Sequence, residues 1–322
     1  MKKALVFVLL MPFLGACSLG TQIVTPTPQV VRPLNPGHGG GTGRIAFTCL
    51  LPSDSTTTIC LSALDGAGLR QFAHLPAGVC CPRWSPDGRR IAFSAVHGSP
   101  PLLSDIWVMN ADGSGLVNLT HAPQQENREP FWSPDGKQLV FSALLGNTLT
   151  LYLMHADGSQ KRLLLRGMEG YSPAWSPDGK QIAFISDLSD TLTTIYVMNA
   201  DGSAITRVTQ VRGFYSSLVW SPDSKHLLYA YAPDSLSLTD VYMMNADGSQ
   251  QVWLISRPSD VASYYPTGWS PDGTKILFER VYRTDGHLGE STVTLWVMNA
   301  DGSGQIPLSL QAQAEGDAVW QP

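Results

Sequence analysis

Six copies of one short unit fill most of this 322-residue chain, and this repetition restricts the possible folds more than any other feature. Each copy contains a Trp that usually opens the phrase Trp-Ser-Pro-Asp-Gly. Relatives of the triplet Ile91-Ala92-Phe93 and of the phrase Asn110-Ala111-Asp112-Gly113-Ser114 also occur six times each. Repeats of this length indicate a solenoid or a propeller. The Trp residues recur 43 to 51 positions apart: Trp84, Trp132, Trp175, Trp220, Trp269 and Trp320.

The two longer phrases are turn sequences. In Ser-Pro-Asp-Gly, the Pro ring fixes φ at the second turn position, and Gly takes the left-handed conformation that closes a hairpin. Asn-Ala-Asp-Gly-Ser predicts a second hairpin, and apolar runs such as Ile106-Trp107-Val108-Met109 are typical of strands covered on both faces. Four strands per unit predict propeller blades, because one blade cannot bury its own faces without neighbours.

The two ends of the repeat region complement each other. The first copy has the triplet Ile45-Ala46-Phe47 but no Trp strand before it, and the last has Trp320 with only two residues after it. We therefore expect the strand from Asp317 to Trp320 to join the blade that starts at Arg44, which closes the ring and removes exposed strand edges. The predicted fold is all-β: residues 44–322 form a six-bladed β-propeller of four-stranded antiparallel blades.

In this repeated form, the two turn phrases resemble the PD40, or WD40-like, repeats of the TolB family, and the resemblance covers residues 44–322. It implies a non-enzymatic propeller that binds proteins in the cell envelope. The chain departs from TolB in two respects, because it carries a lipobox and its linker leaves no room for an amino-terminal α/β domain. A partnership with Pal is therefore not carried over. Similar repeats occur in oligogalacturonate lyases and in dipeptidyl-peptidase-like enzymes, which keeps an enzymatic alternative open.

The N-terminus reads as an export signal. Lys2 and Lys3 precede an apolar stretch that is too short for a lasting transmembrane helix. The sequence Leu14-Gly15-Ala16-Cys17 resembles a bacterial lipobox, so we expect residues 1–16 to be removed and Cys17 to carry a lipid; the alternative is an ordinary secretory leader. Residues 17–43, rich in Pro, Gly and Thr, predict a linker. The expected location is extracytoplasmic, anchored to the cell membrane or outer membrane and facing the periplasm or exterior.

Both tight turns of a blade must lie at one end of its strands, so the variable loops lie at the other end. Loops of variable length tend to carry function, and Arg with aromatic residues is typical of binding patches. We expect a protein or wall-polymer partner there; the alternative is ordinary solvated loops. The candidate binding residues are Arg128, Tyr171, Arg212, Phe214, Tyr215, Tyr264, Tyr265 and Arg283.

Other functions find little support in the sequence. The net charge of −5 and the absence of basic runs beyond the N-terminus argue against nucleic-acid binding. The common sequence motifs for serine nucleophiles, zinc binding and phosphate binding are absent, so we predict no catalytic residues, no metal and no cofactor. We also expect a monomer. The repeated Trp and Asp residues fit packing and turns. The alternative is a lyase- or hydrolase-like propeller with an axial polar or metal site, for which the candidates are His74, His97, His121 and His287.

Four cysteines remain after the expected removal of the leader: Cys49, Cys60, Cys80 and Cys81. Export favours disulfides over free thiols. Three pairings are possible, and we prefer a Cys49–Cys60 bond across a hairpin with a vicinal Cys80–Cys81 bond. A tetrathiolate metal site is the weaker alternative, because the usual paired spacing is missing.

Overall fold

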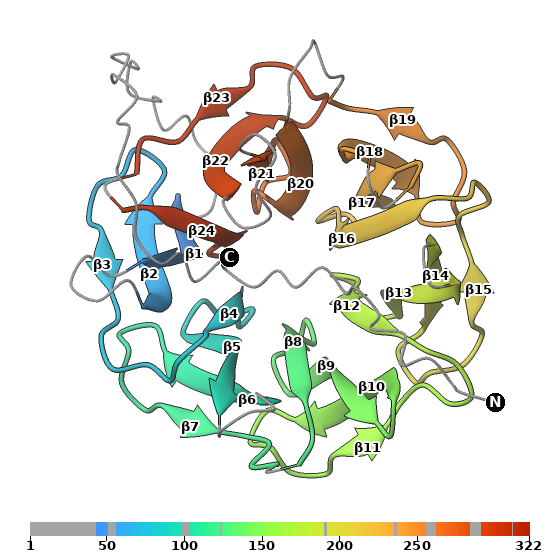
Figure 1. Cartoon of the computed structure of the whole chain (residues 1–322), viewed down its shortest axis with the longest axis horizontal. Coiled ribbons are helices and arrows are strands. Elements are labelled where there is room, and N and C mark those ends of the chain that lie inside the picture. Colours follow the sequence, from blue (N-terminus) through green and yellow to red (C-terminus); the bar gives the residue numbers. More distant parts are fainter. Residues whose placement is uncertain are drawn as a thin grey trace, which may run out of the picture.

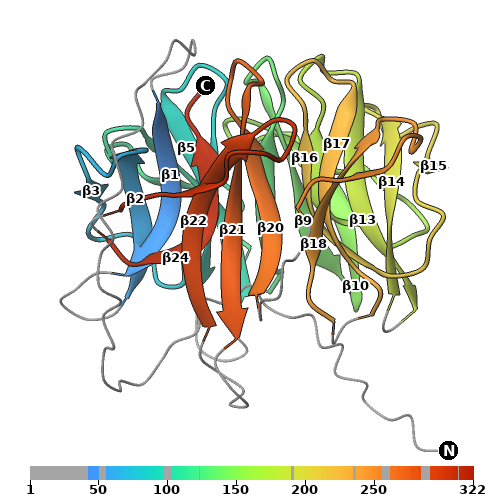
Figure 2. The same cartoon turned by 90° about the horizontal axis from the view of Figure 1, so that it is seen from above.

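The computed structural model describes residues 43–50, 56–97, 103–122, 124–189, 192–234, 237–255, 262–283, 291–310 and 312–322. Within these ranges, 24 strands form six four-stranded antiparallel sheets that stand around a common axis (Figures 1 and 2). The predicted six-bladed β-propeller is thereby confirmed. Among the same residues, no helix is long and apolar enough to cross a membrane.

Each blade runs from an innermost strand at the axis to a short outermost strand at the rim. The innermost strands are β24 (Ala314–Trp320), β4 (Cys80–Trp84), β8 (Asn127–Trp132), β12 (Tyr171–Trp175), β16 (Phe214–Trp220) and β20 (Ala262–Trp269). The second strands are β1 (Arg44–Leu50), β5 (Arg90–His97), β9 (Gln138–Leu145), β13 (Gln181–Ser189), β17 (His226–Ala232) and β21 (Lys275–Arg283). We number the blades 1 to 6 in this order.

The outer half of each blade completes the sheet. The third strands are β2 (Thr57–Ala63), β6 (Leu103–Asn110), β10 (Thr148–His155), β14 (Leu192–Asn199), β18 (Asp240–Asn245) and β22 (Ser291–Asn299). The outermost strands have two residues each: β3 (Arg70–Gln71), β7 (Val117–Asn118), β11 (Arg162–Leu163), β15 (Thr206–Arg207), β19 (Val252–Trp253) and β23 (Ile306–Pro307). Such short edges offer little backbone to a second chain.

The C-terminal strand closes the ring, as predicted. β24 pairs antiparallel with β1, and Trp320 lies opposite Ile45. The Thr48 hydroxyl donates to the Gly316 carbonyl at 2.8 Å, and the Gln321 amide donates to the Arg44 carbonyl at 2.9 Å. Blade 1 therefore contains the two ends of the described propeller (Figure 1).

The blades are held together by apolar side chains and by the repeated Trp residues. Each core cluster contains residues from neighbouring blades; the one between blades 4 and 5 joins Ile195 and Val208 to Trp220 and Tyr229. The indole of Trp220 also donates to the Ala174 carbonyl of the preceding blade at 3.0 Å. Trp132 makes the equivalent bond to the Arg83 carbonyl at 3.1 Å, whereas the other four indoles contribute apolar packing alone among the described residues, which fits the expected packing role of the Trp residues.

Candidate binding face and axial site

The propeller has two unlike ends. In blade 2 the Ser85–Gly88 turn joins β4 to β5, and the Asn110–Ser114 turn joins β6 to β7. The two turns lie side by side, since the Ala111 amide donates to the Arg89 carbonyl at 2.8 Å. The equivalent amides of Ala156, Ala200, Ala246 and Ala300 make the same bond. We call the end with these turns the turn face and the opposite end, where the innermost strands begin, the loop face.

The Asp residues of the turn face are engaged locally. Asp87 accepts bonds from the Ser85 hydroxyl at 2.6 Å and from the Arg89 amide at 3.1 Å. The Ser85 bond lowers the pKa of Asp87, because it favours the charged carboxylate. The same Ser–Asp bond occurs at Asp135, Asp178, Asp223 and Asp272. These carboxylates stabilise turns.

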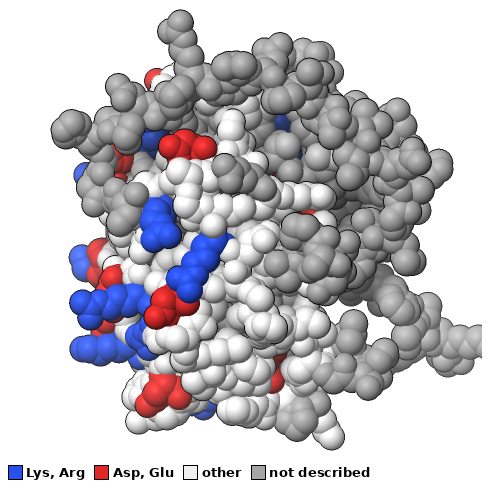
Figure 3. All heavy atoms as spheres, turned by 90° about the vertical axis from the view of Figure 1, so that its left-hand side faces the viewer, with Lys and Arg blue, Asp and Glu red and all other residues white. Residues whose placement is uncertain are grey.

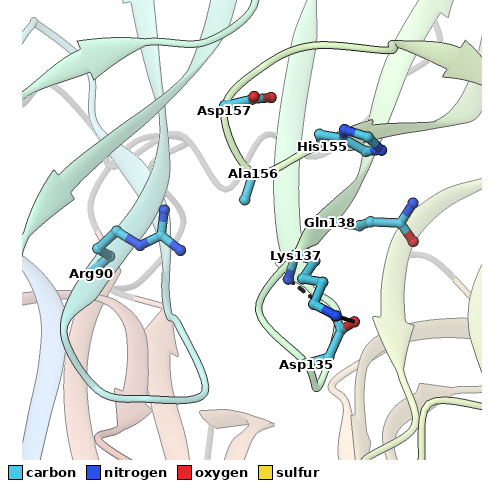
Figure 4. Close-up of a pocket in the computed structure, with 7 residues that line it drawn as sticks. All are labelled: Arg90, Asp135, Lys137, Gln138, His155, Ala156 and Asp157. Atoms are coloured by element: carbon cyan, nitrogen blue, oxygen red, sulfur yellow. Dashed lines mark hydrogen bonds and ion pairs between the residues drawn. The ribbon is translucent and has the colours of Figure 1, made fainter.

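A hollow of about 640 Å³ opens on the turn face between blades 2 and 3. Arg90 lies on one wall and the six other lining residues lie on the opposite wall (Figure 4). The guanidinium of Arg90 lies 4.6 Å from the centre of the Trp132 ring, and Lys137 pairs with Asp135 at 3.8 Å. Charges of both signs also alternate along the left-hand edge of Figure 3. The described charges in this part of the turn face are therefore of both signs, which does not favour attraction of a charged polymer.

Most of the predicted binding residues lie at the start of innermost strands at the loop face, whereas Arg212 precedes β16 and Arg283 ends β21, and several are not available to a partner. Tyr215 and Tyr264 are 2% and 4% exposed. The Tyr171 hydroxyl donates to Asp187 at 2.6 Å, and burial raises the pKa of Tyr171. Arg128 pairs with Glu126 at 3.0 Å. The rings of Tyr215 and Tyr264 face neighbouring blades and so offer little surface to a partner in this structure, while the contact surface itself stays a prediction.

The buried tyrosines have structural roles instead. The Tyr215 hydroxyl donates to the Val211 carbonyl at 2.9 Å, and that of Tyr231 donates to the Arg212 carbonyl at 3.0 Å. These bonds hold the loop before β16, on which the Arg212 side chain is exposed. Tyr264 lies under the guanidinium of Arg280, at 5.7 Å from its ring centre. Of the predicted set, Arg212 is exposed, Phe214 and Tyr265 are half-buried, and the side chain of Arg283 lies outside the described residues.

Polar groups of the innermost strands form a ring at the axis. In the sequence, only histidines were candidates for an axial site. Every innermost strand has a register irregularity against its neighbour. The residue three positions before the Trp has a positive φ in five blades: Cys81, Glu129, Ser172, Ser217 and Asp317. Its amide bonds a side chain of the preceding blade in three of them, and Ser172 N, for example, donates to Glu129 Oε2 at 2.8 Å. The six copies have Cys, Glu, Ser, Ser, Pro and Asp at this position, so the sequence repeat offered no shared residue that would have marked the ring.

Two carboxyl groups of this region lie close together, Glu279 buried and Asp317 half-buried. Glu279 of β21 is 3% exposed and accepts a bond from the Ala318 amide at 3.4 Å. Burial and the nearby Asp317 carboxylate raise the pKa of Glu279 to about 8. Burial also raises the pKa of Asp317, against the opposing effects of the Cys81 amide and Arg83. Burial thus favours the protonated form of both carboxyl groups.

The cysteines divide into a bonded pair and a free pair. The predicted Cys49–Cys60 disulfide joins β1 to β2 and is confirmed. Cys80 and Cys81 are thiols, with a distance of 2.8 Å between their sulfur atoms. The preferred vicinal disulfide is therefore not formed in the structure. The two pairs lie on different blades: Cys49 and Cys60 are on blade 1, and Cys80 and Cys81 are on blade 2.

The histidines named for a metal site do not gather. His97 lies 3.5 Å from Asp105, whereas His74 and His121 are exposed and His287 lies outside the described residues. In the part of the chain that the structure describes, no group of three His, Cys, Asp or Glu side chains is arranged to hold a metal ion.

Comparisons with known proteins agree with this architecture. Among solved structures, TolB from Acinetobacter baumannii superposes with a TM-score of 0.70 at 22% identity, covering 88% of this chain and 68% of that one. An oligogalacturonate lyase in complex with manganese gives a TM-score of 0.51 at 13% identity, covering 81% of this chain and 71% of that one. Both likenesses show the fold alone.

Sequence relatives are more specific. The Tol-Pal system protein TolB of Syntrophus aciditrophicus (strain SB) is 39% identical over 93 residues, 28% of this chain and 20% of that protein. The same-named protein of Anaeromyxobacter dehalogenans (strain 2CP-C) is 52% identical over 40 residues, 12% of this chain and 8% of that protein. The matches thus span a fifth or less of these relatives. The family model of the TolB β-propeller domain, PD40, matches residues 38–322, and the chain therefore belongs to the TolB β-propeller family.

Proposed function

We propose that this protein is a membrane-tethered, extracytoplasmic scaffold whose loop face binds another protein of the cell envelope. One observation carries the proposal: the turn face is built from repeated short hairpins and also holds both ends of the described propeller. The Gly43 carbonyl accepts a bond from Leu64, next to a turn, and the Gln321 side chain donates to the Gly88 carbonyl of another turn at 3.1 Å. At the loop face the connections from second to third strands differ in length between blades, from two residues between β9 and β10 to seven between β17 and β18, and neither described end of the propeller lies there.

The family supports an envelope partner. The relatives named above are called Tol-Pal system proteins. Another protein of the Tol-Pal system is therefore the first partner to test, and a wall polymer is the second. We further propose that residues 1–16 are a lipoprotein signal, that Cys17 carries the lipid and that residues 17–43 link it to the propeller. The apolar stretch before Cys17 and the linker composition support this arrangement.

The second candidate function is an enzyme of the lyase or hydrolase class with an axial site. The observation in its favour is the buried Glu279 with its raised pKa beside Asp317, because perturbed carboxyl groups often lie in active sites. Hydrogen bonds from the innermost strands account for part of this arrangement, since Asp317 accepts the Cys81 amide and Glu279 accepts the Ala318 amide. The scaffold therefore remains the primary proposal.

Partner capture tests the scaffold. The full protein in its host membrane is cross-linked and purified with its partners. Arg212→Ala, Phe214→Ala and Tyr265→Ala are expected to weaken capture by more than about 1 kcal/mol, roughly fivefold, at each true hot spot and to leave the Tm nearly unchanged.

Lys137→Ala and Lys180→Ala are the matched controls. Their side chains are both 80% exposed and lie beside the Pro-Asp-Gly turns of the turn face, so capture should be unaffected. Loss of capture only in these two variants would mean that the turn face is the binding face.

A further inference from the structure

Two free thiols lie together at the loop-face end of β4. Cys80 and Cys81 open this innermost strand, both are half-buried, and the Cys81 thiol donates to the Cys80 sulfur at 2.8 Å. The disulfide between Cys49 and Cys60, in contrast, is fully buried. The protein thus has one protected disulfide and one reachable pair of adjacent thiols.

The pair also lies on the seam that closes the ring. Cys81 is a bulge residue with a φ of 59°, and its amide donates to Asp317 Oδ2 at 3.0 Å. Asp317 belongs to β24, the strand that the C-terminus adds to blade 1. A covalent change at the two cysteines therefore acts on the backbone that joins blades 1 and 2 at the axis.

We propose that Cys80 and Cys81 form a redox-active pair that closes to a vicinal disulfide by exchange with a small disulfide such as oxidised glutathione. In the first step, one Cys thiolate attacks the oxidant, forms a mixed disulfide and releases one thiol. In the second, the other Cys attacks the protein sulfur of that mixed disulfide and releases the second thiol. The cysteines lose two electrons and two protons, which the oxidant gains. This inference goes beyond the proposed binding function and does not depend on it.

The geometry assigns the first attack to Cys80. The Cys81 S–H points at the Cys80 sulfur. The hydrogen bond to Cys80, burial and the Asp317 carboxylate together raise the pKa of the Cys81 thiol, so Cys81 is the poorer first nucleophile. Cys81 is instead in place for the second step, since its sulfur already touches that of Cys80.

A redox titration of the folded, full protein tests the pair. The protein is equilibrated in mixtures of reduced and oxidised glutathione, quenched in acid, alkylated and digested with trypsin. The two pairs separate, because Gln71–Arg83 contains Cys80 and Cys81 whereas Ile45–Arg70 contains Cys49 and Cys60. The peptide Gln71–Arg83 should change between a doubly alkylated form and a form lacking two hydrogen atoms, with one midpoint. The Cys49–Cys60 bond should stay oxidised throughout.

Single variants test the order of attack. With the same oxidant, Cys81→Ser should stop at a mixed disulfide on Cys80, and Cys80→Ser should form its mixed disulfide at least about tenfold more slowly. Equal rates would overturn the assigned order.

Three results of the titration would overturn the redox pair itself: two alkylated thiols at every ratio, a disulfide at every ratio, or glutathione on both cysteines. The titration uses the unaltered protein, so it is decisive even where a variant does not fold. Partner capture is a separate readout, so failure of the scaffold proposal would leave this result unchanged.

Discussion

At the scale of single residues, the axis differs most from an ordinary propeller core. Glu279 is buried beside Asp317, and both carboxyl groups have raised pKa values, mainly because burial disfavours the charged form. The Glu129 carboxylate, in contrast, is well supplied with donors: the Ser142 hydroxyl at 2.7 Å and the amide and hydroxyl of Ser172. These acids thus differ in how many hydrogen-bond donors surround them.

The raised pKa of Glu279 predicts a falling stability with rising pH. Between about pH 4.5 and pH 8 the unfolded chain loses a proton that folded Glu279 keeps, so the contribution of this group is complete below that window and lost above it. Glu279→Gln keeps an acceptor for the Ala318 amide and cannot ionise. At pH 5 the variant and the parent should therefore unfold at similar urea concentrations. At pH 8.5 the variant should be more stable than the parent by on the order of 1–3 kcal/mol.

Asp157→Asn is a control of opposite sign. Asp157 is exposed, and the Ser159 hydroxyl and amide lower its pKa, so its contribution is present at neutral pH and lost as the pH falls through the lowered pKa. As the pH falls, the difference in unfolding free energy between the parent and Asp157→Asn should therefore shrink. If Glu279→Gln and the parent followed parallel curves from pH 5 to 8.5, Glu279 would not be the buried acid described above.

At the scale of the strands, the inner three strands of each blade supply the core and the outermost strand adds little. Ala318 and Val319 of β24 are buried between blades, whereas Val252 and Trp253 of the outermost strand β19 are about half exposed. Burial is most complete in the second and third strands, such as β5 and β6, lower in the innermost strands, such as β4, and lowest in the outermost strands. The contribution of a strand to stability should follow the same order, because apolar area removed from water is the main favourable term.

Deleting residues 316–322 should destabilise the protein by several kcal/mol or cause aggregation. The deletion removes most of β24, exposes the edge of β1 and takes away Asp317, the acceptor for the Cys81 amide. Thermal unfolding with light scattering measures both effects.

Deleting only Gln321 and Pro322 is the matched control. It leaves β24 complete and removes two hydrogen bonds, so a loss of about 1–3 kcal/mol is expected. An equal Tm for the parent and the longer deletion would contradict the role of β24 in ring closure.

At the scale of the whole molecule, the position of the chain ends determines how a tether would orient the propeller. β1 starts and β24 ends at the turn face, so a linker that precedes Gly43 joins the molecule there. The 26 residues from Ser18 to Gly43 reach at most about 85 Å when extended. A lipid on Cys17 would therefore hold the propeller near a membrane and leave its loop face free.

Cys17→Ser tests the tether. The variant should leave the membrane fraction and lack the mass of the acyl groups, because more than one acyl chain is needed for firm anchoring and the variant can receive none. Cell fractionation and intact mass measure these outcomes, and Cys80→Ser serves as a thiol control that should stay with the membrane. A variant that remained in the membrane with an unshifted mass would refute lipidation at Cys17.

The sequence by itself determined the blade number, the closing strand and the hairpins. The reason is that Ser-Pro-Asp-Gly and Asn-Ala-Asp-Gly-Ser act through local backbone preferences, which six repetitions make unmistakable. It also identified Cys49–Cys60, because a hairpin brings these residues together. Only the tertiary structure decided which loop-face side chains are free, because a bulge in each innermost strand breaks the alternation of facing. The axial acids were missed for a related reason: Glu129, Glu279 and Asp317 are distant in sequence, and only the closed ring brings them to one axis.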